Sequence, residues 1–456
     1  MLPESGTNPE DVLVHVARRL VLAYFKIPGS DSSTKCHRHR RAASKKDVAS
    51  ANEDISRSKC RHSPRTRRCR CSSEDREPLL NIVLSYGDLS RQTGFRTRVL
   101  GELLTLDCQP GIETFLLAFD RNPSEFEKTV CIDVPYRVFN RSAMMKFYPA
   151  MAGLARQSRI GLVHAHNLYS AALALSARWL HGYKVILDYH GRVPEEYMFL
   201  GKGGKGSQKV LEALERWVVR NSDHVIAVSQ KLADYVAERY GISSTKMSVI
   251  PCCADQKTFT WEVARRESVR RSLNVSDKLV CAHVGSFFEW YEPHLLVRVF
   301  NGIRSRFDAH LLVVSSEMER IRAYLAAHLA EGSFTVVEAL HRQIPDFLNA
   351  SDLGLLLLRS APNIKTSSPA KFSEYLNCGL PVLITPDVGD FSALIEKERV
   401  GAIVREDGEF EMDFLDRVIA AREDYAARCS AVGRRLTWEA YRTTWSEIIE
   451  SHGLRG

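Results

Sequence analysis

Twelve short apolar runs that alternate with helix-like segments constrain the fold of this chain more than any other feature. They form two sets, with the turn Pro251-Cys-Cys-Ala-Asp255 between them. An apolar run of about four to eight residues bounded by turns is typical of a strand buried on both faces, and intervening helices are typical of parallel sheets. We therefore predict an α/β fold in which two Rossmann-like, doubly wound domains face each other across a cleft.

The two predicted domains divide these strands equally. The strands of the first domain, residues 78–252, are Leu80–Tyr86, Glu113–Phe119, Gly161–Ala165, Tyr183–Tyr189, His224–Ser229 and Lys246–Pro251. The strands of the second domain, residues 253–430, are Leu279–Gly285, His310–Ser315, Ser333–Glu338, Leu353–Leu358, Pro381–Thr385 and Val400–Val404.

The first 77 residues differ in composition from the rest of the 456-residue chain. Between Lys35 and Arg70 there are 13 Lys and Arg against three acids, a balance of +10, whereas the net charge of the whole chain is +8. This segment has almost no aromatic or β-branched residues, so we predict that residues 1–77 form a basic, largely disordered extension. A solvated, dispensable tail is the favoured interpretation; contact with anionic lipid is an alternative, and nucleic acid is the less favoured partner.

The eleven cysteines show no disulfide pattern, and four of them lie in the extension. The Cys and His spacings there match no zinc framework, so we expect no metal site. Cys281 and Cys378 lie in apolar contexts that are typical of reduced core residues. No secretory signal or membrane-spanning run is recognisable, which predicts a cytoplasmic protein. Residues 12–27 could form an amphipathic helix, so peripheral contact with a membrane stays open.

The segment of residues 367–385 is the strongest candidate for a binding site. Ser368 before a proline predicts a helix start at which the serine hydroxyl caps a free backbone N–H, and Gly379 predicts the helix end. Lys371 and Glu374, three residues apart, share one helical face, with the lysine nearer the start, where phosphate is favoured. A ribose diol could donate two hydrogen bonds to the carboxylate while a diphosphate lies at the helix start. The alternative is a solvated Lys–Glu pair. Because the helix follows a predicted strand, it lies at the edge where α/β sheets bind ligands.

Several segments together resemble the family-4 glycosyltransferases of the GT-B fold, in that family's order and spacing. They are Val163-His-Ala-His-Asn167, Leu187-Asp-Tyr-His-Gly-Arg-Val-Pro-Glu-Glu196, Ser222-Asp-His-Val-Ile-Ala-Val-Ser229, Val249-Ile-Pro-Cys-Cys-Ala-Asp255, Val284-Gly-Ser286, Leu348-Asn-Ala-Ser-Asp-Leu-Gly354 and Ser368-Pro-Ala-Lys-Phe-Ser-Glu-Tyr-Leu376. Most of them are weak signals alone, but the combination is specific.

The resemblance implies an enzyme that moves a sugar from a nucleotide-diphosphate donor to a hydroxyl of a glycan or lipid-linked acceptor, in glycan or glycolipid synthesis. It also implies retention of the anomeric configuration and no cofactor, the nucleotide sugar being a substrate. The first domain would hold the acceptor and the second the nucleotide sugar. Residues 431–456 would return to the first domain as a last helix.

The chain departs from the family's pattern where cations are common. After the first strand of the second domain, the family commonly has an Arg and a Lys, and this chain has Ser286 and Tyr291 there. The first of two family glutamates falls at Thr366. Since the departing diphosphate needs positive charge, Lys371 is the expected substitute and a candidate catalytic residue.

The remaining contacts of the donor are assigned by the same resemblance. Glu374 would bind the ribose, and Lys371 would hold the diphosphate together with backbone amides near Gly285, Ser286 and Ser368. The departing phosphate could itself accept the proton of the acceptor hydroxyl.

Polar or small residues also follow predicted strands of the first domain. By resemblance, His190 would contact the donor sugar as a catalytic residue, and a buried structural histidine is the alternative. We expect His164 and His166 to alternate faces, so that at most one faces the cleft, with packing preferred for His164. Gly94 would let substrate approach the backbone, and a plain turn glycine is the alternative.

Two other functions stay open on the sequence alone. A nucleotide-sugar epimerase or hydrolase can have the same two-domain architecture. A non-catalytic relative could bind a nucleotide sugar and use its basic extension on a membrane or nucleic acid.

Overall fold

The computed structural model describes residues 79–453, with gaps at residues 88, 90–92, 110, 120–125, 133–140, 203 and 289. The predicted basic extension, with its lipid and nucleic-acid alternatives, lies outside the described residues.

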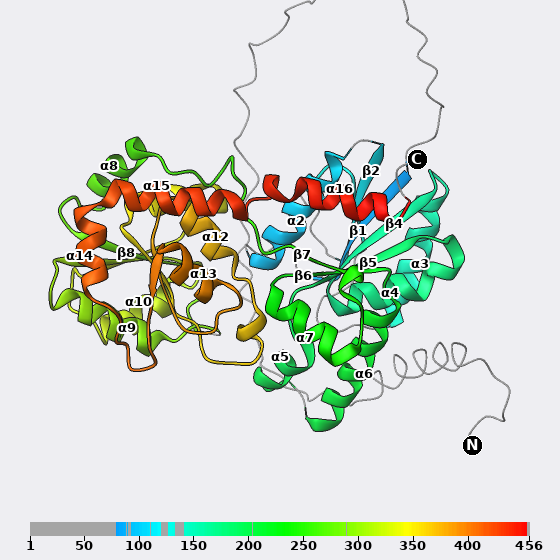
Figure 1. The fold of residues 1–456 in the computed structure, drawn as a ribbon, viewed down its shortest axis with the longest axis horizontal. Coiled ribbons are helices and arrows are strands. Elements are labelled where there is room, and N and C mark those ends of the chain that lie inside the picture. Colours follow the sequence, from blue (N-terminus) through cyan, green and yellow to red (C-terminus); the bar gives the residue numbers. More distant parts are fainter. Residues whose placement is uncertain are drawn as a thin grey trace, which may run out of the picture.

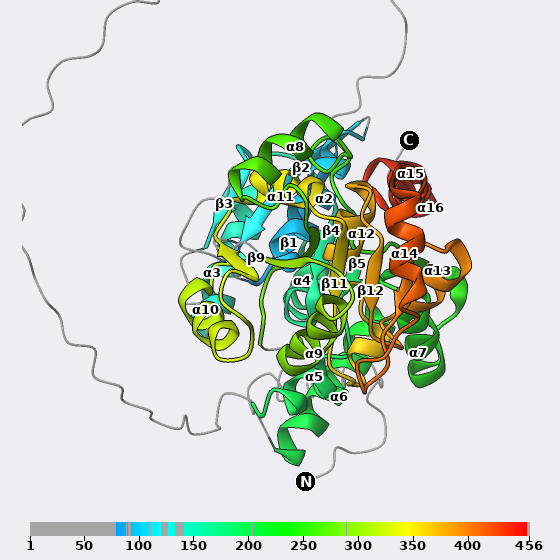
Figure 2. The same ribbon diagram turned by 90° about the vertical axis from the view of Figure 1, so that its left-hand side faces the viewer.

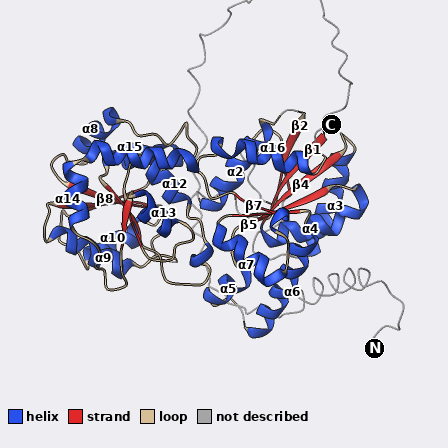
Figure 3. Ribbon diagram, viewed as in Figure 1, coloured by secondary structure: helices blue, strands red, loops and turns tan. Residues whose placement is uncertain are grey.

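The first domain is built on a seven-stranded parallel sheet of order β3-β2-β1-β4-β5-β6-β7, with helices on both faces (Figures 1 and 3). Its strands are β1 (Leu79–Ser85), β2 (Ile112–Ala118), β3 (Thr129–Cys131), β4 (Ile160–His166), β5 (Lys184–Tyr189), β6 (His224–Ala227) and β7 (Met247–Val249). Its helices are α2 (Gly94–Asp107), α3 (Arg141–Ala155), α4 (Asn167–His181), α5 (Val193–Phe199), α6 (Lys205–Asn221), α7 (Gln230–Tyr240) and η1 (Ser244–Lys246). The sequence predicts every strand except β3, whose three residues are too few to show a period.

The second domain has a six-stranded parallel sheet of order β10-β9-β8-β11-β12-β13. Its strands are β8 (Leu279–Val284), β9 (Ala309–Val314), β10 (Phe334–Val337), β11 (Leu353–Leu356), β12 (Val382–Ile384) and β13 (Gly401–Ile403), all of them predicted. Its helices are α8 (Val263–Ser272), α9 (Pro293–Arg304), α10 (Met318–Ala326), α11 (Ile344–Ala350), α12 (Ala370–Asn377), α13 (Phe391–Glu398), α14 (Asp413–Ala420) and α15 (Arg422–Gly433), with short turns η2 (His341–Gln343) and η3 (Ile364–Thr366).

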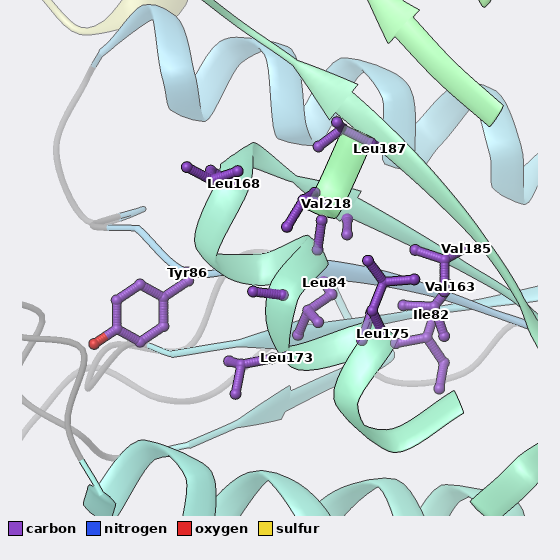
Figure 4. Close-up of a cluster of buried hydrophobic side chains, with 14 of the residues drawn as sticks. Ile82, Leu84, Tyr86, Val163, Leu168, Leu173, Leu175, Val185, Leu187 and Val218 are labelled. Carbon is purple, nitrogen blue, oxygen red and sulfur yellow. The ribbon is translucent and has the colours of Figure 1, made fainter. Parts of the chain in front are cut away.

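The strands form where the sequence is apolar on both faces, because helices cover both sides of each sheet. In β1, Ile82 and Leu84 face α4 and α6, as Figure 4 shows with their neighbours in β4 and β5. Val83 points the opposite way and packs beneath α2 and the C-terminal helix. Fully burying each such side chain contributes about 1.5–3 kcal/mol, so the alternation orients the whole strand.

The end of the chain crosses from the second domain to the first. Helix α15 lies along the second domain, and after η4 (Arg434–Leu436) and η5 (Glu439–Tyr441) helix α16 (Arg442–Ser451) lies along the first (Figures 1 and 2). Trp445, Ile448 and Ile449 of α16 pack in the same buried cluster as Val83 of β1. The two domains are therefore joined twice, by the segment after β7 and by this crossing.

Side chains also bind directly across the domain boundary. The Asp390 carboxylate, which precedes α13, accepts hydrogen bonds from the backbone N–H groups of Gln230 and Lys231, at 2.6 and 3.2 Å, at the start of α7. The Ser229 hydroxyl donates to the carbonyl oxygen of Thr366 at 2.8 Å. These contacts hold the start of α7 against η3 and the start of α13.

Both sheets reverse their strand order beside the first strand of the domain, between β1 and β4 and between β8 and β11. Open α/β sheets bind ligands outside the carboxyl ends of the strands at such a point. Among the described helices, none is both long and apolar enough to cross a bilayer.

Candidate functional site

Helix α12 and the end of β8 meet at the reversal point of the second sheet. Gly285, directly after β8, has a φ of +111°, a conformation that favours glycine. A Cβ atom added there would lie 3.5 Å from Cε of Lys371 on α12. The backbone N–H of Gly285 donates to the carbonyl oxygen of Val314, so this particular amide is already used. The lysine stem therefore lies over the backbone where the sheet order reverses.

Lys371 and Glu374 form a buried ion pair rather than a solvated one. Their Nζ and Oε2 atoms are 2.9 Å apart, and the side chains are 16% and 0% exposed. Nε2 of His341, from η2, lies 3.3 Å from the other carboxylate oxygen. Burial alone would raise the pKa of Glu374, but the Lys371 ammonium and the His341 ring outweigh it and lower this pKa below its usual value. Glu374 is therefore an ionised acceptor at neutral pH.

The prediction that Ser368 caps this helix is wrong. Helix α12 begins at Ala370, its N-cap residue is Pro369, and no side chain caps it. The Ser368 hydroxyl instead accepts a hydrogen bond of 2.9 Å from the backbone N–H of Cys252, in the segment that joins the domains. A backbone N–H from another part of the chain therefore donates to the oxygen that the local sequence predicts to be the helix cap.

The predicted helix end is confirmed. The N–H groups of Gly379 and Leu380 donate to the carbonyl oxygens of Leu376 and Tyr375, both at 3.0 Å, and Gly379 has a φ of +72°. This pairing is the Schellman arrangement that glycine favours after a helix.

The positions where the family has cations or the first of its two glutamates carry no charge here. The carbonyl oxygen of Ser286 lies 2.9 Å from Nε2 of His283. Burial, together with nearby Glu374, raises the pKa of Tyr291, so that side chain stays a neutral phenol. The Thr366 carbonyl is the acceptor of the interdomain bond from Ser229. Lys371 is thus the cation next to Glu374 in the described part of this site.

In the first domain, His190 follows the carboxyl end of β5 and is 23% exposed. Its Nε2 atom lies 2.6 Å from Oδ2 of Asp188, which is two residues earlier and inside β5. Nδ1 of His166, at the end of β4, lies 2.9 Å from the same oxygen. The His190 ring also packs against Phe95 at the start of α2, with ring centroids 5.5 Å apart.

A buried arginine lies behind these groups. The Arg98 guanidinium of α2 donates from Nε and Nη2 to the two oxygens of Asp188, at 2.7 and 2.6 Å, and Nη2 lies 2.7 Å from Glu102. Although burial opposes ionisation, Arg98 and the neighbouring histidines hold the pKa of Asp188 well below its usual value. Burial raises the pKa of Glu102 well above its usual value, despite Arg98. The pKa values of the two acids that share the guanidinium are therefore shifted in opposite directions.

The prediction that His164 and His166 alternate faces is wrong. Successive side chains of a strand alternate, so residues two apart share a face. Both rings point toward Glu102, with Nε2 of His164 and of His166 at 3.2 and 3.6 Å from its Oε2 atom. Burial is the main cause that lowers the pKa of both histidines, to about 4 for His166. The two imidazoles are therefore held in their neutral forms beside Glu102.

One group of side chains in the described residues has a spacing that could hold a metal ion. The ligand atoms of Glu102, His164, His166 and Asp188 lie within 4.8 Å of one another, and all four residues are buried. Arg98 already supplies the positive charge that both acids share. We therefore assign no metal to this group.

Gly94 is the first residue of α2, and a Cβ atom added there would meet nothing within 4 Å. The neighbouring glycine with a steric requirement is Gly87, where an added Cβ would lie 2.3 Å from the Phe95 ring. Gly87 therefore lets Phe95 approach the chain beside His190.

The predicted site residues form two groups. Gly285, Lys371 and Glu374 come together at the second sheet, and His190 lies at the first. Sequence reasoning missed Arg98, Asp188 and His341. Asp188 could have been found, because it is two residues before His190 and so shares its strand face.

Comparisons with known proteins agree with this architecture. Residues 98–257 match the family model described as Glycosyltransferase Family 4, and residues 278–424 match the model described as Glycosyl transferases group 1. A D-inositol 3-phosphate glycosyltransferase of Rhodococcus erythropolis (strain PR4 / NBRC 100887) is 25% identical over 307 residues, which cover 64% of this chain and 67% of the relative.

Solved structures resemble the whole described fold. Sucrose-phosphate synthase (tll1590) from Thermosynechococcus elongatus superposes with a TM-score of 0.62 at 17% identity, covering 82% of this chain and 98% of that one. Anabaena Alr3699/HepE in complex with UDP-glucose superposes with a TM-score of 0.61 at 15% identity, covering 82% and 100%. At these identities the likeness concerns the fold.

Proposed function

This chain belongs to the family-4 glycosyltransferases of the GT-B fold, and from that premise we propose that α12 binds the nucleotide diphosphate of its sugar donor. The observation that carries the proposal is the fully buried, ionised Glu374 with the Lys371 ammonium 2.9 Å away, beside Gly285 at the reversal point of the second sheet. A buried carboxylate with a single ammonium partner suits a ligand that brings hydroxyl donors and negative charge together.

Glu374 accepts hydrogen bonds from the ribose hydroxyls in this proposal, and Lys371 neutralises the diphosphate. The lysine head covers Oε2 of the glutamate in the structure, so donor binding moves it from the carboxylate toward the phosphates. Gly285 lets the donor approach the backbone closely. No metal takes part, because Lys371 and the first amides of α12 stabilise the charge on the departing diphosphate.

The first domain supplies the sugar contacts. Both polar contacts of the His190 ring with described residues, to Asp188 and His166, involve Nε2, so its Nδ1 atom faces the sugar as an acceptor. The departing phosphate accepts the proton from the acceptor hydroxyl, and transfer retains the anomeric configuration. Much of the rate enhancement then comes from holding donor and acceptor in the reacting geometry.

The relatives suggest which compounds to test first. Anabaena Alr3699/HepE was solved with UDP-glucose, so UDP-glucose is the first donor. The Rhodococcus relative is named for D-inositol 3-phosphate, so an inositol phosphate is tested beside glycan and lipid-linked acceptors.

The deciding experiment measures UDP and UDP-glucose binding by calorimetry, with Glu374→Gln and Lys371→Ala variants. Loss of a charged hydrogen-bond partner costs about 1.5–3 kcal/mol, so Glu374→Gln should weaken nucleotide binding roughly tenfold to hundredfold. Lys371→Ala should lower kcat by about 10²–10³, the effect of removing one donor from a developing charge.

Exposed residues on α13 provide matched controls. Glu396→Gln and Lys397→Ala make the same chemical changes on the surface of the same domain and should leave binding and turnover unchanged. Normal turnover in Lys371→Ala would contradict the proposal. Hydrolysis or epimerisation with no transfer to any acceptor would instead favour the alternative reactions of this architecture.

A further inference from the structure

Three consecutive residues that join the domains are held from both sides. In the first domain, Nη1 of Arg98 donates to the carbonyl oxygens of Ile250 and Pro251, both at 3.0 Å. In the second domain, Ser373 of α12 donates to the Cys252 carbonyl at 2.7 Å, and Ser368, two residues before α12, accepts from the Cys252 N–H at 2.9 Å. The segment 250–252 therefore connects Arg98 to the helix that carries Lys371 and Glu374.

Two other nitrogen atoms of the Arg98 guanidinium bind Asp188, which contacts His190. Its Nε and Nη2 atoms form a two-pronged contact with Asp188, and Oδ2 of Asp188 lies 2.6 Å from Nε2 of His190. One planar group thus serves a carboxylate and two carbonyl oxygens at once. Lysine, with a single nitrogen, could not span these acceptors.

The contact with Asp188 determines which tautomer a neutral His190 ring adopts. An ionised Asp188 can only accept hydrogen bonds, so the proton of a neutral His190 lies on Nε2. Nδ1 is then an acceptor. The tautomer of a histidine is set by the partner of its other nitrogen, and Asp188 is in turn oriented by Arg98.

We propose that Arg98 is a positioning residue that joins the two halves of the donor site. Through Asp188 it fixes the tautomer of His190, and through the Ile250 and Pro251 carbonyls it fixes the position of His190 relative to α12. The inference rests on the proposed donor site, but its first test needs no ligand.

A second buried arginine provides the matched control. In the second domain, Nη1 of Arg270 donates to Asp352 and to the Ala350 carbonyl, both at 2.9 Å, which repeats the carboxylate and carbonyl pattern away from α12. Arg270→Lys makes the same change as Arg98→Lys in a similarly buried arginine.

The first test reads the His190 tautomer by nitrogen-15 NMR of the full chain labelled at histidine, with His190→Gln to assign its signals. We expect the Nε2–H form in the wild type and in Arg270→Lys. Asp188→Asn and Arg98→Lys should show a substantial Nδ1–H fraction. A wild-type Nδ1–H ring, or the same tautomer in all variants, would overturn the proposal. If Arg98→Lys does not fold, Asp188→Asn decides.

The second test separates sugar contacts from nucleotide contacts. UDP binding, which depends on α12, should stay within about twofold in Arg98→Lys and Asp188→Asn, whereas kcat with UDP-glucose should fall roughly tenfold to hundredfold, the size of a lost charged hydrogen bond. When Asp188→Asn is added to His190→Ala, kcat should fall little further than in His190→Ala alone. Equal kcat losses in Arg98→Lys and Arg270→Lys would show a merely structural role. Wild-type protein that binds neither compound would count against the proposed donor and leave the NMR result standing.

Discussion

The two domains each bury an arginine–aspartate network, and the networks lie at opposite ends of their sheets. Asp188 lies near the carboxyl end of β5, two residues before His190. Asp352 directly precedes β11 and accepts a hydrogen bond of 2.8 Å from the backbone N–H of Val280 at the amino end of β8. Because α/β sheets bind ligands at the carboxyl end, we assign the first network to the proposed donor site and the second to the scaffold.

The two networks also differ in charge balance. Arg266, Arg270 and Arg422 all bind Asp352, so positive charge is in excess. Burial and the neighbouring arginines lower the pKa of Arg422 to about 10, although Asp352 opposes them. In the first domain one guanidinium faces two acids, and burial raises the pKa of Glu102 well above its usual value. The scaffold network depends on its one carboxylate, whereas burial in the site network favours the protonated form of Glu102.

The largest expected effect comes from removing Asp352. Asp352→Ala leaves three buried or half-buried arginines without their carboxylate, and breaking such an ion pair costs about 3–5 kcal/mol. We expect that loss in urea unfolding, with kcat per folded molecule unchanged. A fall in kcat of the folded fraction would remove the distinction between scaffold and site.

For Glu102→Gln we expect a smaller change in stability, in the opposite direction to the loss in Asp352→Ala. A pKa raised in the folded state contributes stability that is present below the unfolded value of about 4.3 and is lost as pH rises through the folded value. Glutamine keeps the shape and removes this loss, so the variant should equal or exceed the wild type in free energy of unfolding above neutral pH.

The contrast with Asp352 sharpens this measurement. The pKa of Asp352 is lowered, because three arginines outweigh burial, so its contribution is present above about pH 3.9 and is lost as pH falls. Urea titrations at pH 4, 7 and 8.5 should therefore show opposite pH trends for the two variants. The quantity compared is the free energy of unfolding of Glu102→Gln and of Asp352→Asn, each relative to the wild type. Destabilisation of Glu102→Gln at pH 8.5 would show that Glu102 is ionised.

The smallest expected effect concerns the link between the domains. Ser373→Ala removes the hydrogen bond to the Cys252 carbonyl and should cost about 0.5–1.5 kcal/mol of stability. Ser392→Ala, buried in α13 with bonds inside its own domain, is the matched control. If α12 and the segment 250–252 move as a unit, Ser373→Ala should also lower kcat with UDP-glucose, whereas Ser392→Ala should not.

The sequence predicted the strands because each is specified by a local pattern. Apolar runs such as Leu80–Tyr86 need a covering layer whatever their neighbours are, and β1 forms within one residue of those bounds. Lys371 and Glu374 meet because three residues separate them on a helix, which is also a local relation. The error over His164 and His166 came from misapplying the same strand period.

Partners distant in sequence were decided by the tertiary structure alone. Ser368 follows the pattern of a helix cap, yet its hydroxyl binds Cys252, 116 residues away. Arg98 and Asp188 are 90 residues apart, and nothing in either segment indicates the other. The amino-acid sequence by itself determined the sheets, the family and the helix with its charged pair, because periodicity and spacing act over a few residues. The fold decided which polar atoms share a buried space, since that depends on how whole layers pack.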